Sequence, residues 1–132
     1  MQFEEPLTSW LILVGRLCLA AVFAVSGVHK ALYYDKAVAE FRAAGVAAVR
    51  LLLPLTIVLH LLGSTALASG HFAREAAVAL ALFTAVATAK VHGFWRMEGE
   101  QRLVQSRIAL AHLAIVGGLI LLAAAGPGTL TL

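Results

Sequence analysis

The chain has 132 residues, of which 61% are hydrophobic and 13% are charged, with a formal net charge of +3. Soluble domains average roughly 45–50% apolar and about 25% charged residues, so this composition excludes a water-soluble globular domain, and its apolar content excludes a disordered chain. The chain therefore belongs in a lipid bilayer, where an excess of positive charge indicates orientation and not a nucleic-acid partner.

Four segments are long and apolar enough to cross a bilayer, which takes about 20 residues in a helix. Because lipid offers no partner for backbone amides, each segment should be an α-helix. The spans run over about residues 10–29, 51–69, 75–91 and 107–125. We predict an all-α fold: one domain over residues 1–132 that forms an integral membrane four-helix bundle.

The first segment could instead be a cleaved signal peptide, but two features favour a true span. The chain begins Met-Gln-Phe-Glu-Glu-Pro, which is acidic where a signal peptide is basic, and Arg16 interrupts the apolar run. Cys18 is preceded by Arg16 and Leu17, which is not a convincing lipoprotein setting. As the single cysteine, Cys18 excludes an internal disulfide and a C-x-x-C redox pair.

The connection between the first two spans is predicted to hold a short helix over about residues 35–44. Asp35 is a candidate N-cap, and Gly45 could end the helix. Basic side chains on this helix suit lipid headgroups, so we expect it to lie on the membrane surface. By contrast, residues 126–132, Gly-Pro-Gly-Thr-Leu-Thr-Leu, are expected to fray.

The basic residues fall mainly on one side of the predicted bundle. On the other side, the connections carry only Arg74, with Glu75 and two further glutamates near it. The positive-inside rule therefore places both basic connections in the cytoplasm and both termini outside. The residues on the basic side are Lys30, Lys36, Arg42, Arg50, Lys90, Arg96, Arg102 and Arg107.

Polar groups inside the first two spans need partners, because they are costly in hydrocarbon. Arg16 lies about two turns into the first span, while the second carries Thr56, His60 and Ser64 at a spacing of four, on one helical face. Arg16 and His60 could meet at similar depth. In the equally weighted alternative, Arg16 reaches out to headgroups or Glu75, and His60 bonds a backbone carbonyl.

A second polar stripe follows the third span, where Thr84, Thr88 and His92 repeat at a spacing of four. His29 closes the first span at the same level, and His112 lies near that side of the fourth. Three neutral imidazoles near one interface could ligate a metal. The spans contain no H-E-x-x-H or Glu-x-x-His pattern and no interior carboxylate, so we predict neither a metal site nor a haem.

The same end of the bundle offers a candidate headgroup site formed by His29, Lys30, His92 and Trp95. Quinone carbonyls accept hydrogen bonds from His or Lys, and aromatic rings provide stacking area over an apolar floor. The alternative is structural, since Lys and aromatic residues are the normal interfacial anchors of any span.

Several strings in the sequence resemble the DoxX family of membrane proteins, and together they cover nearly the whole chain. The matching strings are Val14-Gly15-Arg16-Leu17, Phe23 to Lys30, Leu61 to Gly70 with Arg74 after it, Val91-His92-Gly93-Phe94-Trp95, and Ile115 to Leu122. Arg16, Gly27, Lys30 and His92 match the family's pattern position by position. One position departs from it: where family members often carry a Glu that could pair with the first-helix Arg, this chain has His60.

The resemblance implies a four-helix protein of the bacterial inner membrane that accompanies a redox system. Our first hypothesis is a non-catalytic subunit with no intrinsic cofactor. It would anchor or organise a partner redox protein, or form a homo-oligomer, and it would bind quinone or lipid in the bundle. In the alternative, the chain takes direct part in quinone reduction, although no catalytic residue can be assigned. A third hypothesis, a small transporter, rests on the two polar stripes.

Overall fold

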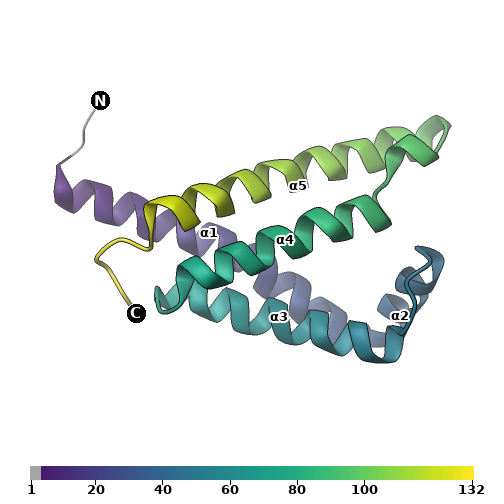
Figure 1. The fold of residues 1–132 in the computed structure, drawn as a ribbon, viewed down its shortest axis with the longest axis horizontal. Helices are drawn as coiled ribbons and strands as arrows, with labels where there is room; N and C mark the ends of the chain where they lie inside the picture. Colours follow the sequence, from purple (N-terminus) through teal and green to yellow (C-terminus); the bar gives the residue numbers. More distant parts are fainter. Residues whose placement is uncertain (1–3) are drawn as a thin grey trace.

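The computed structural model describes residues 4–132; the first three residues of the predicted domain lie outside the described part. Between residues 4 and 132 every regular element is helical, as predicted (Figure 1). The elements are α1 (Glu5–Leu32), α2 (Tyr34–Ala43), α3 (Val49–Ser69), α4 (Ala73–Val91), the 3-10 helix η1 (Phe94–Arg96) and α5 (Gly99–Ala125).

The four predicted spans correspond to α1, α3, α4 and α5, each of which is long and apolar enough to cross a membrane. The helices extend beyond the predicted spans, most clearly in α5, which begins at Gly99 although the apolar run begins near Arg107. A helix need not end where hydrocarbon ends, because its backbone hydrogen bonds are satisfied internally at the headgroup level as well.

The bundle consists of two helix pairs. α1 packs along α3, α4 packs along α5, and contacts between α3 and α4 join the pairs. One end carries both termini and the α3–α4 turn, and we call it the termini end. At the other end the two pairs separate, and α2 and the α4–α5 connection lie there (Figure 1). We call this second end the open end.

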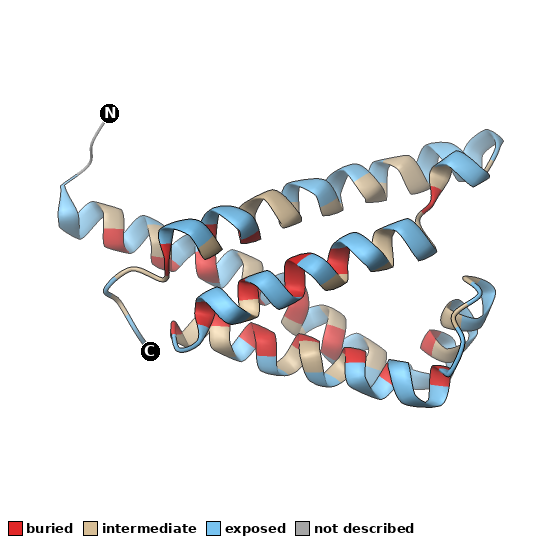
Figure 2. Ribbon diagram, in the orientation of Figure 1, coloured by how far each residue is buried: buried red, intermediate tan, exposed pale blue. Residues whose placement is uncertain are grey.

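Alanine and leucine side chains, together with one phenylalanine, form the main core and come from all four spans. At the α3–α4 contact, a Cβ atom added to Gly63 would lie 2.9 Å from Leu80 Cδ1, so the missing side chain allows the two helices to approach closely. Buried residues face the inside of the bundle, whereas the outer faces are exposed (Figure 2). The core cluster comprises Ala20, Phe23, Leu67, Ala77, Leu80, Ala81, Leu119 and Leu122.

The short helix between the first two spans is present as α2, although Asp35 is not its cap. Tyr33 occupies the N-cap position without a side-chain hydrogen bond, and its N–H is bonded to the carbonyl of His29. Because α1 and α2 are separated by this single residue, Asp35 falls inside the first turn. Gly45 follows the helix with φ +75°, a conformation that glycine adopts without strain.

The prediction that residues 126–132 fray is wrong. This segment, which we call the C-terminal strap, folds back across the termini end (Figure 1). The Leu132 N–H donates to the Ser69 carbonyl at 2.9 Å, and the hydroxyl groups of Ser9 and Thr129 are 2.8 Å apart. The strap is ordered because it supplies carbonyl oxygens to a buried guanidinium group, described below.

Candidate functional site

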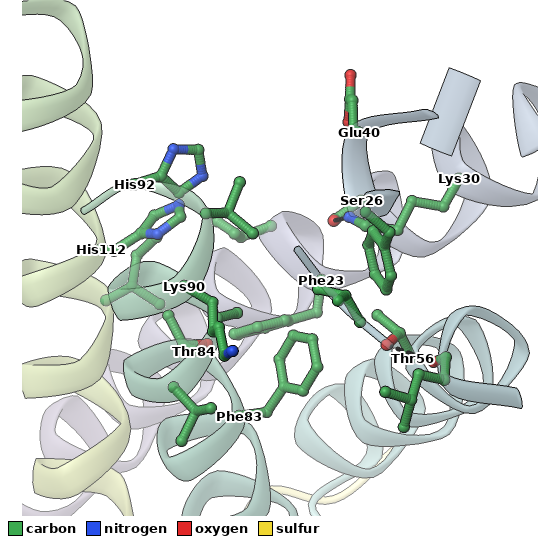
Figure 3. Close-up of a pocket in the computed structure, with 18 of the residues that line it drawn as sticks. Phe23, Ser26, Lys30, Glu40, Thr56, Phe83, Thr84, Lys90, His92 and His112 are labelled. Atoms are coloured by element: carbon green, nitrogen blue, oxygen red, sulfur yellow. Dashed lines mark hydrogen bonds between the residues drawn. The ribbon is translucent and has the colours of Figure 1, made fainter. Parts of the chain in front are cut away.

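The open end of the bundle holds a cleft of about 570 Å³, walled mainly by apolar side chains of α1, α3, α4 and α5 and bordered by α2 (Figure 3). Val22, Leu52 and Val86 line it and are also exposed on the outside of the bundle, so the cleft has an apolar edge toward lipid. Its polar lining residues are Ser26, Lys30, Glu40, Thr56, Thr84, Lys90, His92 and His112.

The hydrogen bonds of His112 determine which of its ring nitrogens carries the proton. Thr88 Oγ1 lies 2.6 Å from the Thr84 carbonyl oxygen and 2.8 Å from His112 Nδ1. A carbonyl oxygen can only accept, so the single hydroxyl hydrogen of Thr88 is directed to Thr84. His112 Nδ1 must then donate to Thr88, which leaves the Nε2 lone pair of neutral His112 free to accept a hydrogen bond.

His92 has the same arrangement one turn beyond Thr88. Its Nδ1 lies 2.5 Å from Gln105 Oε1, and that amide oxygen is an acceptor, so His92 Nδ1 donates. The rings of His92 and His112 meet edge to face with centroids 5.2 Å apart. Both imidazoles therefore have an Nε2 acceptor available for a hydroxyl group of a ligand.

Lys30 brings a hydrogen-bond donor to the opposite wall of the cleft. Its Nζ donates to Ser26 Oγ, one turn earlier in α1, at 2.5 Å. Both residues line the cleft, and Glu40 of α2 lines it on the same side (Figure 3). The ammonium group is thus held over the cleft, where it can bind a carbonyl or phosphate oxygen.

The four residues of the predicted headgroup site do not meet in one place. Lys30 and His92 line the cleft, but His29 and Trp95 do not. His29 is exposed and packs on Tyr33, with ring centroids 4.7 Å apart. Trp95 is 56% exposed, and the guanidinium carbon of its neighbour Arg96 lies 5.7 Å from its ring.

Three phenylalanines line the cleft, and sequence reasoning missed the part that two of them, Phe23 and Phe83, play in it. An aromatic residue inside a span gives no periodic signal that distinguishes a cleft wall from a lipid-facing position. The polar stripe offered an indirect signal, because Phe83 directly precedes Thr84. Of the histidines, His112 lines the cleft although it was not in the predicted headgroup site, whereas His29 was predicted and does not line it. Among the described residues, no three His, Cys, Asp or Glu side chains gather as a metal site.

Arg16 lies at the termini end, away from the cleft, and is 1% exposed. Its Nε and Nη2 donate to the carbonyl oxygens of Leu67 and Ala68, each at 2.9 Å. Its Nη1 donates to Pro127 at 2.5 Å and to Leu130 at 2.6 Å, both in the C-terminal strap. Carbonyls in the last turn of a helix lack intrahelical partners, so the end of α3 and the strap together form a cage of acceptors around the cation.

Both sequence interpretations of Arg16 and His60 are therefore wrong. Arg16 bonds neither His60 nor a group outside the bundle, because four backbone carbonyls already surround it. His60 does not bond a carbonyl either: it is 4% exposed, and neither ring nitrogen has a hydrogen-bond partner among the described residues. The neighbours Thr56 and Ser64 bond carbonyls of their own helix.

Comparison with known proteins agrees with this architecture. Residues 11–93, which include most of α1 and all of α2, α3 and α4, match the DoxX family model. The chain is 27% identical over 123 residues to inner membrane protein YphA of Escherichia coli (strain K12), and the alignment covers 92% of this chain and 87% of that protein. No solved structure matches the chain. The resemblance seen in the sequence is thus confirmed, and the chain belongs to the DoxX family of integral membrane proteins.

Proposed function

We propose that this protein is a small, non-catalytic subunit of the bacterial inner membrane, whose cleft binds the polar head of a quinone or a lipid beside a partner redox protein. The cleft at the open end carries this proposal. It combines apolar walls and a lipid-facing edge with polar groups, which is the arrangement that recognises an amphiphile.

The polar groups of the cleft favour a head that both accepts and donates hydrogen bonds. Lys30 is a donor, which suits a quinone carbonyl or a lipid phosphate. His92 and His112 each offer an Nε2 acceptor, which suits the hydroxyl group of a quinol or of a lipid glycerol. A quinone carries carbonyl groups where its quinol carries hydroxyl groups, so the donor and the acceptors of the cleft could bind both redox states of one ring.

The partner role is supported by the family resemblance and by the outer surface of the bundle. α5 is the least buried of the four spans. Leu110, Leu113 and Leu121 on this helix are each more than half exposed, so the helix offers an apolar face to a second membrane protein. Purification in a mild detergent should recover such a partner, and a chain that repeatedly purifies alone would rule out the subunit role.

The proposed orientation places the open end in the cytoplasm, because the basic residues cluster there. Two variants test it in a Cys18→Ser background: Arg42→Cys in α2 and His71→Cys in the α3–α4 turn, both at exposed positions. A maleimide that cannot cross membranes should label His71→Cys in intact cells, and Arg42→Cys only after lysis. The opposite pattern would overturn the orientation.

Ligand binding is tested with the purified protein and three probes: a short-chain benzoquinone, its quinol and a lysophospholipid. Titration calorimetry should detect saturable binding of at least one of them. His112→Leu should weaken that binding about tenfold or more, which corresponds to about 1.4 kcal/mol. The matched control, His29→Leu, changes an exposed histidine outside the cleft and should bind like the wild type. Failure of all three probes to bind would reject the proposal.

A further inference from the structure

His60 is a buried polar side chain that the protein itself does not satisfy. A neutral imidazole carries one N–H donor and one acceptor nitrogen, and neither has a partner in the described part of the chain. Buried polar groups in native proteins are almost always hydrogen-bonded, so an orphan of this kind indicates a bound molecule. The hydroxyl hydrogens of Thr56 and Ser64 are already donated to carbonyls of α3, so neither side chain can donate to the acceptor nitrogen of His60.

The surroundings of His60 indicate how a molecule in the cleft could approach it. On the α1 side the helices are in close contact, since a Cβ atom added to Gly27 would lie 3.1 Å from His60 Cβ. The rings of Phe23 and Phe83 cover the imidazole, with centroids 5.3 Å and 5.0 Å from it, and both of these rings line the cleft. Phe23 is buried, whereas Phe83 is half-buried, so Phe83 is the ring whose rotation would open a way from the cleft to His60.

We propose that His60 is the deep hydrogen-bonding contact for the molecule held in the cleft, reached by displacement of Phe83. This inference rests on the proposed function and specifies its ligand. His60 lies behind the rings of Phe23 and Phe83, whereas Lys30 and His112 line the cleft itself, so the molecule would have one polar contact behind the rings and others in the cleft.

The need to bond both His60 and the polar groups of the cleft selects the class of ligand. A ring with oxygen atoms on opposite sides, as in a quinone or quinol, bonds His60 with one oxygen and the groups near Lys30 and His112 with the other. An imidazole suits both redox states, because it donates to a carbonyl and accepts from a hydroxyl. A lipid with a single polar head would place its apolar chain against His60 and leave both nitrogens orphaned. We infer that the cleft binds the two-ended ring more tightly than a lipid head.

The decisive variant is His60→Leu, which replaces the imidazole with an apolar side chain of similar size. It removes no hydrogen bond among the described residues. We expect its thermal unfolding temperature to equal or exceed that of the wild type, and its affinity for the short-chain benzoquinone to fall about tenfold. Affinity for the lysophospholipid should stay unchanged. His112→Leu serves as the comparison, because it should weaken benzoquinone binding by removing a contact at the other end of the site.

A second measurement uses the unchanged protein with 15N-labelled histidine. Addition of the benzoquinone should shift the ring 15N resonances of His60 and leave those of exposed His71 in place. If the quinone binds the wild type and His112→Leu weakens it, but His60→Leu does not and the His60 signals stay unmoved, the deep contact is overturned while the proposed function stands. Exchange signals that assign a bound water to His60, unaffected by quinone, would overturn it equally. If the lysophospholipid binds the wild type and no quinone does, the deep contact is likewise overturned while the proposed function stands; if none of the three probes binds, both proposals fail.

Discussion

Arg16 in the first span and Leu130 near the C-terminus are joined by a hydrogen bond of 2.6 Å across 114 residues of sequence. Among the residues that the structure describes, the guanidinium group makes three further bonds to backbone carbonyls and none to a carboxylate. A buried cation is thus balanced by oriented dipoles instead of by an opposite charge. Since the carbonyls come from α3 and from the strap, this one side chain connects the two ends of the chain at the termini end of the bundle.

Loss of the Arg16 side chain should destabilise the fold strongly. Arg16→Leu leaves four carbonyl oxygens without their donor, and hydrogen bonds to a charged group contribute about 1.5–3 kcal/mol each, so we expect a loss of about 3 kcal/mol or more. Arg16→Lys should be intermediate, because an ammonium group lacks the planar fork that reaches all four oxygens. Unfolding followed in detergent checks this. The control Arg102→Leu, at an exposed position, should change stability by less than about 0.5 kcal/mol.

The C-terminal strap should act through Arg16. Deletion of residues 127–132 removes two of the four acceptors, together with the contacts of Thr129 and Leu132. We expect a loss of about 2–4 kcal/mol. The variant that combines this deletion with Arg16→Leu should lose about 0.5–3 kcal/mol less stability than the sum of the two separate losses, because the partners belong to one network. Strict additivity in this double-mutant cycle would show that strap and guanidinium act independently.

The sequence was sufficient to locate the spans and α2, because hydrocarbon leaves a strong compositional signal. It was not sufficient for the strap, whose Gly-Pro-Gly-Thr composition is typical of a mobile tail. The usable clue was Arg16 itself. A buried cation with no carboxylate in the neighbouring spans needs free carbonyls, and these occur only at helix ends and in irregular segments.

The cleft could be predicted only in part, because helix rotation decides which side chains enter it. His29 and Lys30 are adjacent in sequence, yet successive residues point about 100° apart around a helix, so one lines the cleft and the other faces outward. Nor could spacing show that His60 lacks a partner. An orphaned group is recognised only when every neighbour is known, and here the neighbours come from three different helices.

Close contact between α3 and α4 should make Gly63 intolerant of a side chain. Gly63→Ala would place a methyl group 2.9 Å from Leu80 Cδ1, and overpacking of this kind costs about 1–3 kcal/mol. Gly117→Ala is the matched control, since within residues 4–132 its added Cβ would meet no atom of a neighbouring element within 4 Å. It should leave the protein unchanged or stabilise it by up to about 1 kcal/mol, because alanine is the better helix former. Equal unfolding temperatures for the two variants would contradict the packing described here.

The cleft should be blocked by adding volume without disturbing the bundle. Ala87 of α4 lines the cleft and is half-buried, so Ala87→Phe directs a ring into the space that a ligand would occupy. The added ring does not require the core to rearrange. We therefore expect the free energy of unfolding in detergent to stay within about 0.5 kcal/mol of that of the wild type. Binding of benzoquinone and of lysophospholipid should both fall, because the ring excludes any occupant. Val58→Phe adds a similar volume on the lipid-facing side of α3, where the side chain is 50% exposed, and should bind both probes normally. Unchanged binding to a folded Ala87→Phe protein would place the ligand outside this cleft, since no head group could share the space with the added ring.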